Sequence, residues 1–303
     1  MSANPGSPAR AILYALLANL AIAISKLIAG LYTSSGAMIA EAIHSFADTA
    51  NQVLLFVGLR SSTRPADAEH PLGYGKLTYF WSFIVAILLF SMGGLFSISE
   101  GIHKLEAETA LKVPWVGLLV LLVAIVLESA SLAGCLREVA LLRSGKSFRG
   151  WLRHTRNAEL IIVLGEDIAA IIGLLLAMGF LSAAWITGDT RYDAWGSICI
   201  GSVLILVAIF VAVRVQSLLV GKSAEPDMRR LIDEAIAADE HVVEVLNTIT
   251  MHFGAQVMLA AKIRMDDGMS LGDAVRFINQ LESRIKTRFP EVEWCFIEPD
   301  NSR

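Results

Sequence analysis

The sequence predicts an α-helical membrane protein with six transmembrane helices followed by a small cytosolic α+β domain. Composition predicts the class: of the 303 residues, 55% are hydrophobic and only 18% are charged, whereas about a quarter of a soluble domain is charged. The mean hydropathy is +0.59. Helices are favoured because a helix satisfies its own backbone hydrogen bonds in lipid. The net charge of −4 gives no indication of nucleic-acid binding.

A spanning helix needs about 20 mostly apolar residues, and six segments meet this requirement. They run over residues 11–31, 36–59, 78–99, 113–135, 158–181 and 194–219. The polar residues that stand out within them are Lys26 in the first, Glu128, Ser129 and Ser131 in the fourth, and Glu159, Glu166 and Asp167 in the fifth. Lys26 is tolerable in a span if its side chain faces the other helices.

Lys and Arg are distributed unequally between the two sides of the predicted bundle. One side has ten of them: Arg10, Arg60, Arg64, Lys76, Arg137, Arg143, Lys146, Arg149, Arg153 and Arg156. The other side has Lys104, Lys112 and Arg191. Because positive residues collect on the cytoplasmic side, both termini are expected there, in a plasma or inner membrane. Residues 1–9 show no signal- or transit-peptide pattern, so we expect the first span to be retained.

From residue 221 onwards, dense charge and short apolar runs replace the long apolar segments. We therefore divide the chain into a transmembrane domain, residues 1–220, and a cytosolic domain, residues 221–303. The patterns in the second part predict a helix over 228–238, strands over 242–253 and 256–265, a helix over 270–289 and a strand over 292–297. Because so small an α-β-β-α-β unit has a marginal core, it is expected to pack against a partner copy.

The second apolar segment carries a polar face. Its four members, Glu41, His44, Asp48 and Asn51, are spaced three or four apart, so they lie on one side of a helix. Ionisable groups at membrane depth are costly and usually face a protein interior or a water-filled path. Imidazole and carboxylate together suit zinc and neighbouring divalent ions. We predict that His44 and Asp48 form half of a metal site; the alternative is a polar seam that holds the helices together.

The fifth segment is the best source of the remaining ligands. Asp167 lies near its middle, with Glu166 beside it. Adjacent residues point about 100° apart on a helix, so both reach one site only if the helix is distorted or the site is wide. Glu166 could instead pair with Lys26 or form a hydrogen bond across the bundle.

Two further groups are weaker candidates. Asp67, Glu69 and His70 lie in the loop after the second segment and could hold a metal ion on its way in, although a capped turn is the favoured interpretation. His241 and His252 lie in the terminal domain without a cysteine near them. We interpret these two as surface or edge histidines.

Several of these stretches resemble a known family. Residues 35–48 (SGAMIAEAIHSFAD) resemble the second span of the cation diffusion facilitators. Residues 70–76 (HPLGYGK), 192–198 (YDAWGSI) and 218–226 (LLVGKSAEP) are similar to their loop before span three, the opening of their sixth span and their hinge into the cytosolic domain. The resemblance implies a metallochaperone-like cytosolic domain, a homodimer, and export of Zn²⁺ or a related ion, often against protons.

The resemblance also implies a site of four ligands. Two, four apart on span two, match His44 and Asp48, and a third on span five matches Asp167. Val163 stands where the fourth is expected, and residues 157–170 instead resemble the branch containing the ninth animal zinc transporter, which has a Glu-Asp pair. Glu166, Asn51, Glu41 or water could complete the shell. In the loop, Asp67 and His70 match a secondary site, but Tyr74 replaces its third ligand.

The expected function is efflux of a divalent cation by proton antiport through the mid-membrane site. Zn²⁺ is the first expectation, with Mn²⁺, Fe²⁺ or Co²⁺ open because carboxylates suit harder ions. No covalent chemistry is needed, so neither an enzyme nor a cofactor is expected, and the HExxH motif is absent from the sequence. The alternative is a membrane metal sensor or scaffold that binds the ion without transporting it.

Overall fold

The computed structural model describes residues 8–107, 111–143 and 145–301, with side chains described from residue 19 and not for residue 107. Its elements in chain order are α1 Pro8–Thr33, α2 Gly36–Ser62, α3 Leu77–Leu88, the π-helix η1 Leu89–Leu95, α4 Phe96–Ala107, α5 Pro114–Leu142, α6 Phe148–His154, α7 Ala158–Thr187, α8 Arg191–Val220, α9 Pro226–Ala237, β1 Val242–Phe253, β2 Gln256–Met265, α10 Leu271–Arg288 and β3 Val292–Pro299. The expectation of no leader in residues 1–9 falls mostly outside these residues, as does the side chain of Arg10.

The expected class, a helical membrane protein with a small α+β domain, is confirmed. Within the described ranges, four helices are long and apolar enough to cross a membrane: Leu77–Glu106, Pro114–Leu142, Ala158–Thr187 and Arg191–Val220. The helices α1 and α2 have 26 and 27 residues, which is sufficient length. The count of six spans stays a prediction for these two, because α2 carries the polar face and the apolar stretch of α1 among the residues with described side chains is the shorter Asn19–Thr33.

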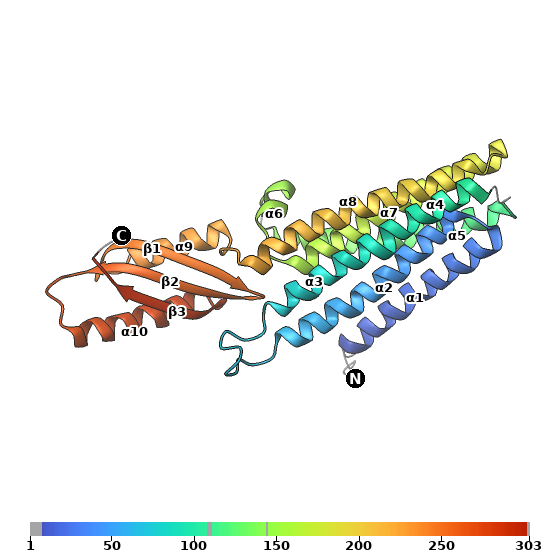
Figure 1. Cartoon of the computed structure of the whole chain (residues 1–303). Helices are drawn as coiled ribbons and strands as arrows, with labels where there is room; N and C mark the ends of the chain where they lie inside the picture. The colour runs from blue at the N-terminus through green and yellow to red at the C-terminus, as the bar shows by residue number, and fades with distance from the viewer. Residues whose placement is uncertain (1–7, 108–110, 144, 302–303) are drawn as a thin grey trace, which may run out of the picture. The chain divides into compact units, whose positions relative to one another are not determined.

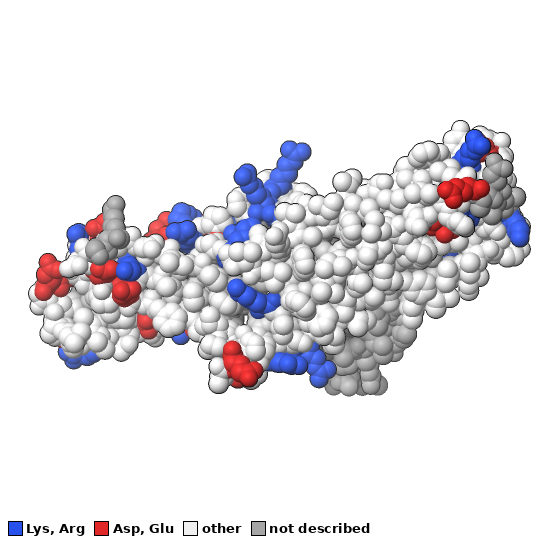
Figure 2. Space-filling model, in the orientation of Figure 1, with Lys and Arg blue, Asp and Glu red and all other residues white. Residues whose placement is uncertain are grey.

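The long helices lie side by side in a bundle (Figure 1). On the face seen in Figure 2, the bundle surface between the helix ends is almost free of Lys, Arg, Asp and Glu. Large apolar side chains are exposed along the helices, among them Leu119 and Val126 of α5, Leu175 of α7 and Leu206 of α8. Such a surface suits lipid and would be costly in water.

The third span is continuous from α3 through η1 into α4 and packs closely against α8. Gly94 of η1 and Gly201 of α8 face each other, because a Cβ added to Gly201 would lie 2.6 Å from the carbonyl oxygen of Gly94. About two turns further, a Cβ on Gly101 would lie 2.7 Å from the carbonyl oxygen of Ala194. Only glycine permits these backbone approaches. The sequence predicts this span to end at residue 99; in the structure it continues to Ala107.

The terminal domain follows the predicted order of elements. Its sheet has the order β1-β2-β3, with β1 antiparallel and β3 parallel to β2. Alternate residues of β2 are buried, as the pattern Val257, Leu259, Ala261, Ile263 predicts. They form one core with α9 and α10, which supply residues such as Ile232, Ile236, Phe277, Leu281 and Ile285. Both helices therefore cover the same face of the sheet.

By packing, the chain divides into two compact units. The first comprises residues 1–57, 81–145 and 159–214, and the second comprises residues 58–80, 146–158 and 215–303. The second unit thus combines the terminal domain with the loop after α2 and with α6, a seven-residue helix that the sequence does not predict. The boundary between residues 220 and 221 stays a prediction.

Within the second unit, the tip of the β1–β2 hairpin lies against the loop that precedes α3. The hydroxyl of Tyr79 donates to the carbonyl oxygen of Gly254 at 3.1 Å. A Cβ added to Gly75 would lie 2.2 Å from the carbonyl oxygen of Phe253, and the ammonium of Lys76 lies 4.8 Å from the ring centroid of Phe253. Gly254 has φ +68°, which favours glycine. The contact leaves no room for a side chain at residue 75.

Candidate metal centre

The predicted polar face of α2 is present and buried. Glu41, His44 and Asn51 have 0% exposed surface, and the Asp48 side chain is 17% exposed. His44 Nδ1 lies 3.4 Å from Asp48 Oδ1, one helical turn away. Neither ring nitrogen of His44 has a hydrogen-bond partner among the described residues. Burying an imidazole without hydrogen-bond partners is costly. Ring nitrogens left without such partners are expected in a side chain that binds a metal ion.

Glu41 faces α1 and α7. Its Oε2 lies 3.3 Å from Nζ of Lys26, which also donates to Ser45 Oγ at 2.8 Å. Its Oε1 lies against Gly173, where a Cβ would approach to 2.2 Å. Lys26 is fully buried, as expected for a lysine that faces the bundle. Glu41 therefore serves first as the counter-charge of Lys26, and its role as a ligand stays a prediction.

Asn51 connects the second and fifth spans. Its Nδ2 donates a 2.7 Å hydrogen bond to Glu166 Oε1, whereas Asn51 Oδ1 has no partner among the described residues. This is the bond across the bundle that the sequence offered as one interpretation of Glu166. It holds one carboxylate oxygen of Glu166 against α2 and leaves the other oxygen for a second contact.

A small cavity of about 70 Å³ lies between α1, α2, α5 and α7. Its polar lining residues are Asn19, Ser45, Asp48, Gln52, Glu128, Ser131, Glu166 and Asp167, and its apolar ones are Ile22, Val163 and Ala170. One water needs about 10–15 Å³ of such space, so a divalent ion fits with a few waters. Glu166 and Asp167 both line this cavity. The site is thus wide enough for adjacent residues of α7.

Three of the six predicted ligands, Asp48, Glu166 and Asp167, line the same cavity. His44 and Asn51 lie behind them, in contact with Asp48 and Glu166 respectively. Val163 lines the cavity as an apolar side chain, so the expected fourth ligand is missing from the wall itself. In this side-chain arrangement, no three His, Cys, Asp or Glu groups among the described residues converge closely enough to hold one ion.

Glu128 of α5 is the cavity carboxylate that the sequence did not single out as a ligand. Beside it, the hydroxyl of Ser131 donates to both oxygens of Asp167, at 3.3 and 3.5 Å. A single carboxylate in an apolar segment has no second ligand at helical spacing that would mark it as part of a site. The available signal was its position at membrane depth, where carboxylates are rare.

The loop residues form a closed turn. Asp67 Oδ1 accepts hydrogen bonds from the backbone N–H groups of His70 at 2.7 Å and Glu69 at 3.0 Å. Its Oδ2 accepts from the hydroxyl of Tyr74 at 2.6 Å, and this bond holds the pKa of Asp67 below its usual value. The ring of His70 stacks on Tyr74 with centroids 4.3 Å apart. Each group has a structural role, and metal binding by Asp67 and His70 stays a prediction.

The histidines of the terminal domain do not form a site together. His241 precedes β1 and His252 lies near its end, so about 11 residues at roughly 3.3 Å each separate them. The ring of His241 packs edge-on against Phe277, with centroids 4.9 Å apart. Burial, with the positive charge of Arg156, lowers the pKa of His252 to about 4.

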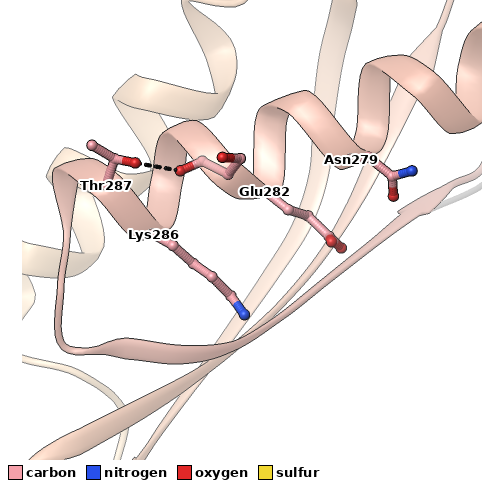
Figure 3. Close-up of a pocket in the computed structure, with 5 residues that line it drawn as sticks. Asn279, Glu282, Lys286 and Thr287 are labelled. Atoms are coloured by element: carbon pink, nitrogen blue, oxygen red, sulfur yellow. Dashed lines mark hydrogen bonds between the residues drawn. The ribbon is translucent and has the colours of Figure 1, made fainter.

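A shallow groove on α10 is the other hollow of note among the described residues (Figure 3). Its lining residues are Asn279, Glu282, Ser283, Lys286 and Thr287. The hydroxyl of Thr287 donates to the carbonyl oxygen of Ser283 at 2.8 Å, and Glu282 accepts from the backbone N–H of Ile297 at 3.3 Å. These side chains support the helix and its contact with β3, and they give no indication of a ligand.

The fold and the cavity define a helical membrane protein with a buried, carboxylate-lined centre and a small α+β domain. The chain belongs to the cation efflux family: residues 12–220 match the cation efflux transmembrane domain, and residues 224–301 match the cytoplasmic domain of cation efflux proteins. The family expected from the sequence motifs is thereby confirmed.

Individual relatives refine this placement. The chain is 31% identical to the mitochondrial proton-coupled zinc antiporter SLC30A9 of Xenopus laevis, over 86% of this chain and 47% of that protein. It is 34% identical to metal tolerance protein C4 of Arabidopsis thaliana, over 74% and 50%. It is 24% identical to the manganese efflux system protein MneP of Bacillus subtilis, over 94% and 93%. The chain spans about half the length of the first two.

Proposed function

We propose that this protein exports a divalent cation across a membrane in exchange for protons, through the cavity between α1, α2, α5 and α7. The observation that carries the proposal is the cavity itself, in which Asp48 of α2 meets Glu166 and Asp167 of α7. Its membership of the cation efflux family and the antiporter among its relatives support it. Those relatives bear transporter names, and they give no support to the sensor or scaffold alternative.

The proposed ion is Zn²⁺, with Mn²⁺ as the second candidate, since relatives are named for zinc and for manganese. Fe²⁺ and Co²⁺ remain open on ligand chemistry alone. The ligands are His44, Asp48 and Asp167, completed by Glu166, Asn51 or Glu41. Metal binding requires a neutral imidazole and ionised carboxylates. Protons that reach the same groups from the opposite side compete with the metal and release it.

We propose that the protein acts as a homodimer with both termini on the cytoplasmic side of a plasma or inner membrane. The match to the cytoplasmic domain of cation efflux proteins supports the dimer. The exposed face of the sheet, with Ile249 and Phe296 each more than half exposed, offers apolar surface for a partner. The excess of Lys and Arg in the loops between spans two and three and between spans four and five supports the orientation.

The test is metal transport into proteoliposomes under an imposed pH gradient, with Asp48→Ala and Asp167→Ala compared with the parent. Both variants are expected to lose most of the pH-driven flux, because each removes a cavity carboxylate. Asp267→Ala, an exposed turn residue of the terminal domain, is the matched control and is expected to transport normally. Parental flux in Asp48→Ala would show that the cavity is not the transport site.

A further inference from the structure

Glu128 occupies an unusual position on α5. The buried residues of this helix are Gly117, Leu121, Ala124, Cys135 and Val139, whose successive spacings of four, three, eleven and four residues define one inward-facing stripe. Glu128 falls four residues after Ala124 and seven before Cys135, so it belongs to that stripe. The other ionisable residues of α5, Arg137 and Glu138, are exposed. A carboxylate in an interior stripe at membrane depth is costly, and such residues usually mark a functional site.

The surroundings of Glu128 contain acids and no base. It shares the cavity with Asp48, Glu166 and Asp167, and no other described residue donates a hydrogen bond to it or forms an ion pair with it. The Lys26 ammonium is engaged with Glu41 and Ser45 and does not line the cavity. Four carboxylates around a space of about 70 Å³ repel one another in a medium of low dielectric constant. A divalent cation in that space removes the repulsion.

The chemical groups that line the cavity also indicate which kind of cation it would bind. Its polar atoms are carboxylate, amide and hydroxyl groups, and the imidazole of His44 is not among them. Oxygen ligands suit Mn²⁺ and similar hard ions, whereas Zn²⁺ is bound readily by nitrogen and sulfur. Val163 supplies no ligand on α7. Glu128 enters the same space from α5 and provides one.

We propose that Glu128 is a ligand of the transported cation, takes the place that Val163 leaves vacant, and contributes more to the binding of oxygen-preferring ions such as Mn²⁺ than to the binding of Zn²⁺. This inference rests on the proposed transport function of the cavity. It extends the site from two helices to three, with α5 as the third contributor.

The experiment measures the concentration dependence of Mn²⁺ and Zn²⁺ transport in proteoliposomes for Glu128→Gln, which keeps the size of the side chain and removes its charge. The KM for Mn²⁺ is expected to rise about tenfold or more, since a charged contact is lost, and the KM for Zn²⁺ is expected to rise less. Glu138→Gln, an exposed change on the same helix, should leave both values at the parental level. Binding of Mn²⁺ to the full-length protein in detergent, followed by electron paramagnetic resonance, should weaken in Glu128→Gln by a similar factor.

Asp48→Asn separates the two hypotheses. If Glu128→Gln keeps parental KM values and Mn²⁺ binding while Asp48→Asn loses transport, the assignment of Glu128 is wrong and the transport function stands. Equal losses for both ions, in a variant that elutes from gel filtration like the parent, would overturn the selectivity assignment. If Asp48→Asn transports like the parent, the proposed function itself fails.

Discussion

The side-chain amide of Asn51 in α2 donates a 2.7 Å hydrogen bond to the carboxylate of Glu166 in α7. Both side chains are buried, and they are 115 residues apart in the chain. The bond ties the two helices that carry the proposed ligands, and it orients one acid of the Glu166–Asp167 pair. Asn51 therefore positions the site even where it does not touch the cation.

Replacing Asn51 with Leu should destabilise the protein and slow transport. The change leaves a buried Glu166 oxygen without its donor, at a cost of about 1–3 kcal/mol. Thermal unfolding in detergent measures the first effect, and flux into proteoliposomes measures the second. Gln280→Leu, an exposed change on α10, is the control and should cost less stability. Equal melting of Asn51→Leu and the parent would mean that the bond contributes nothing to the fold.

Replacing Lys26 with Met should destabilise the protein more strongly. Lys26 and Glu41 are both fully buried and lie 3.3 Å apart, so the change leaves an uncompensated carboxylate, at a cost of about 3–5 kcal/mol. The double variant Lys26→Met, Glu41→Gln removes both charges and should recover most of the loss. A double-mutant cycle of unfolding measurements checks this expectation. Additive losses in the double variant would contradict a direct pairing.

The stability of the second unit should fall as the pH falls from 6.5 towards 4. Burial, with the charge of Arg156, lowers the pKa of His252 to about 4, whereas an unfolded histidine titrates near 6.5. In this window the unfolded chain binds a proton that the folded chain rejects, so acid favours unfolding. At pH 5 the free energy of unfolding is therefore expected to be about 2 kcal/mol lower than at pH 8 because of this histidine.

Comparing the full-length parent with His252→Leu at pH 8 and pH 5 isolates this effect. The variant should lose less stability on acidification than the parent. His241→Leu changes a half-exposed ring and serves as the control. An identical loss in the parent and His252→Leu would show that this histidine does not contribute to the pH dependence.

A methyl group at residue 75 should disrupt the contact between the hairpin tip and the loop before α3. In Gly75→Ala the new Cβ would lie 2.2 Å from the carbonyl oxygen and 2.7 Å from the carbonyl carbon of Phe253. Both are backbone atoms, so the strain, about 1–3 kcal/mol, is not relieved by a side-chain rotation. Gly272→Ala meets only Ser270 Oγ, at 3.9 Å, and should be nearly neutral. Limited proteolysis and thermal unfolding of both variants check the difference.

The terminal domain was largely predictable from the sequence because its patterns are local. Alternation along β2 and the three-to-four spacing in α10 each depend on one element, and the structure confirms both. The parallel pairing of β3 with β2 was not predicted, because it depends on which strands the helices bring together. The helix α6 was missed because seven residues give too short a pattern.

The candidate site was predictable where its residues follow one another at helical spacing. The face of α2 has that spacing, and Asp167 could be found as an acid at membrane depth. Glu128 has no second polar residue at three or four positions with a clear ligand chemistry, so its place in the cavity depends on how α5 packs. The engagement of Glu41 with Lys26 likewise depends on the approach of α1 to α2.

The glycine contacts between the third span and α8 restrict how the bundle can rearrange. Where the backbones of Gly94 and Gly201 touch, sliding or separation of the two helices would open a gap that no side chain can fill. The third span and α8 are therefore expected to move together as one rigid body. If the cation is to be exposed alternately to the two sides, the helices must separate elsewhere in the bundle, and the cavity between α1, α2, α5 and α7 is lined by neither of these two spans.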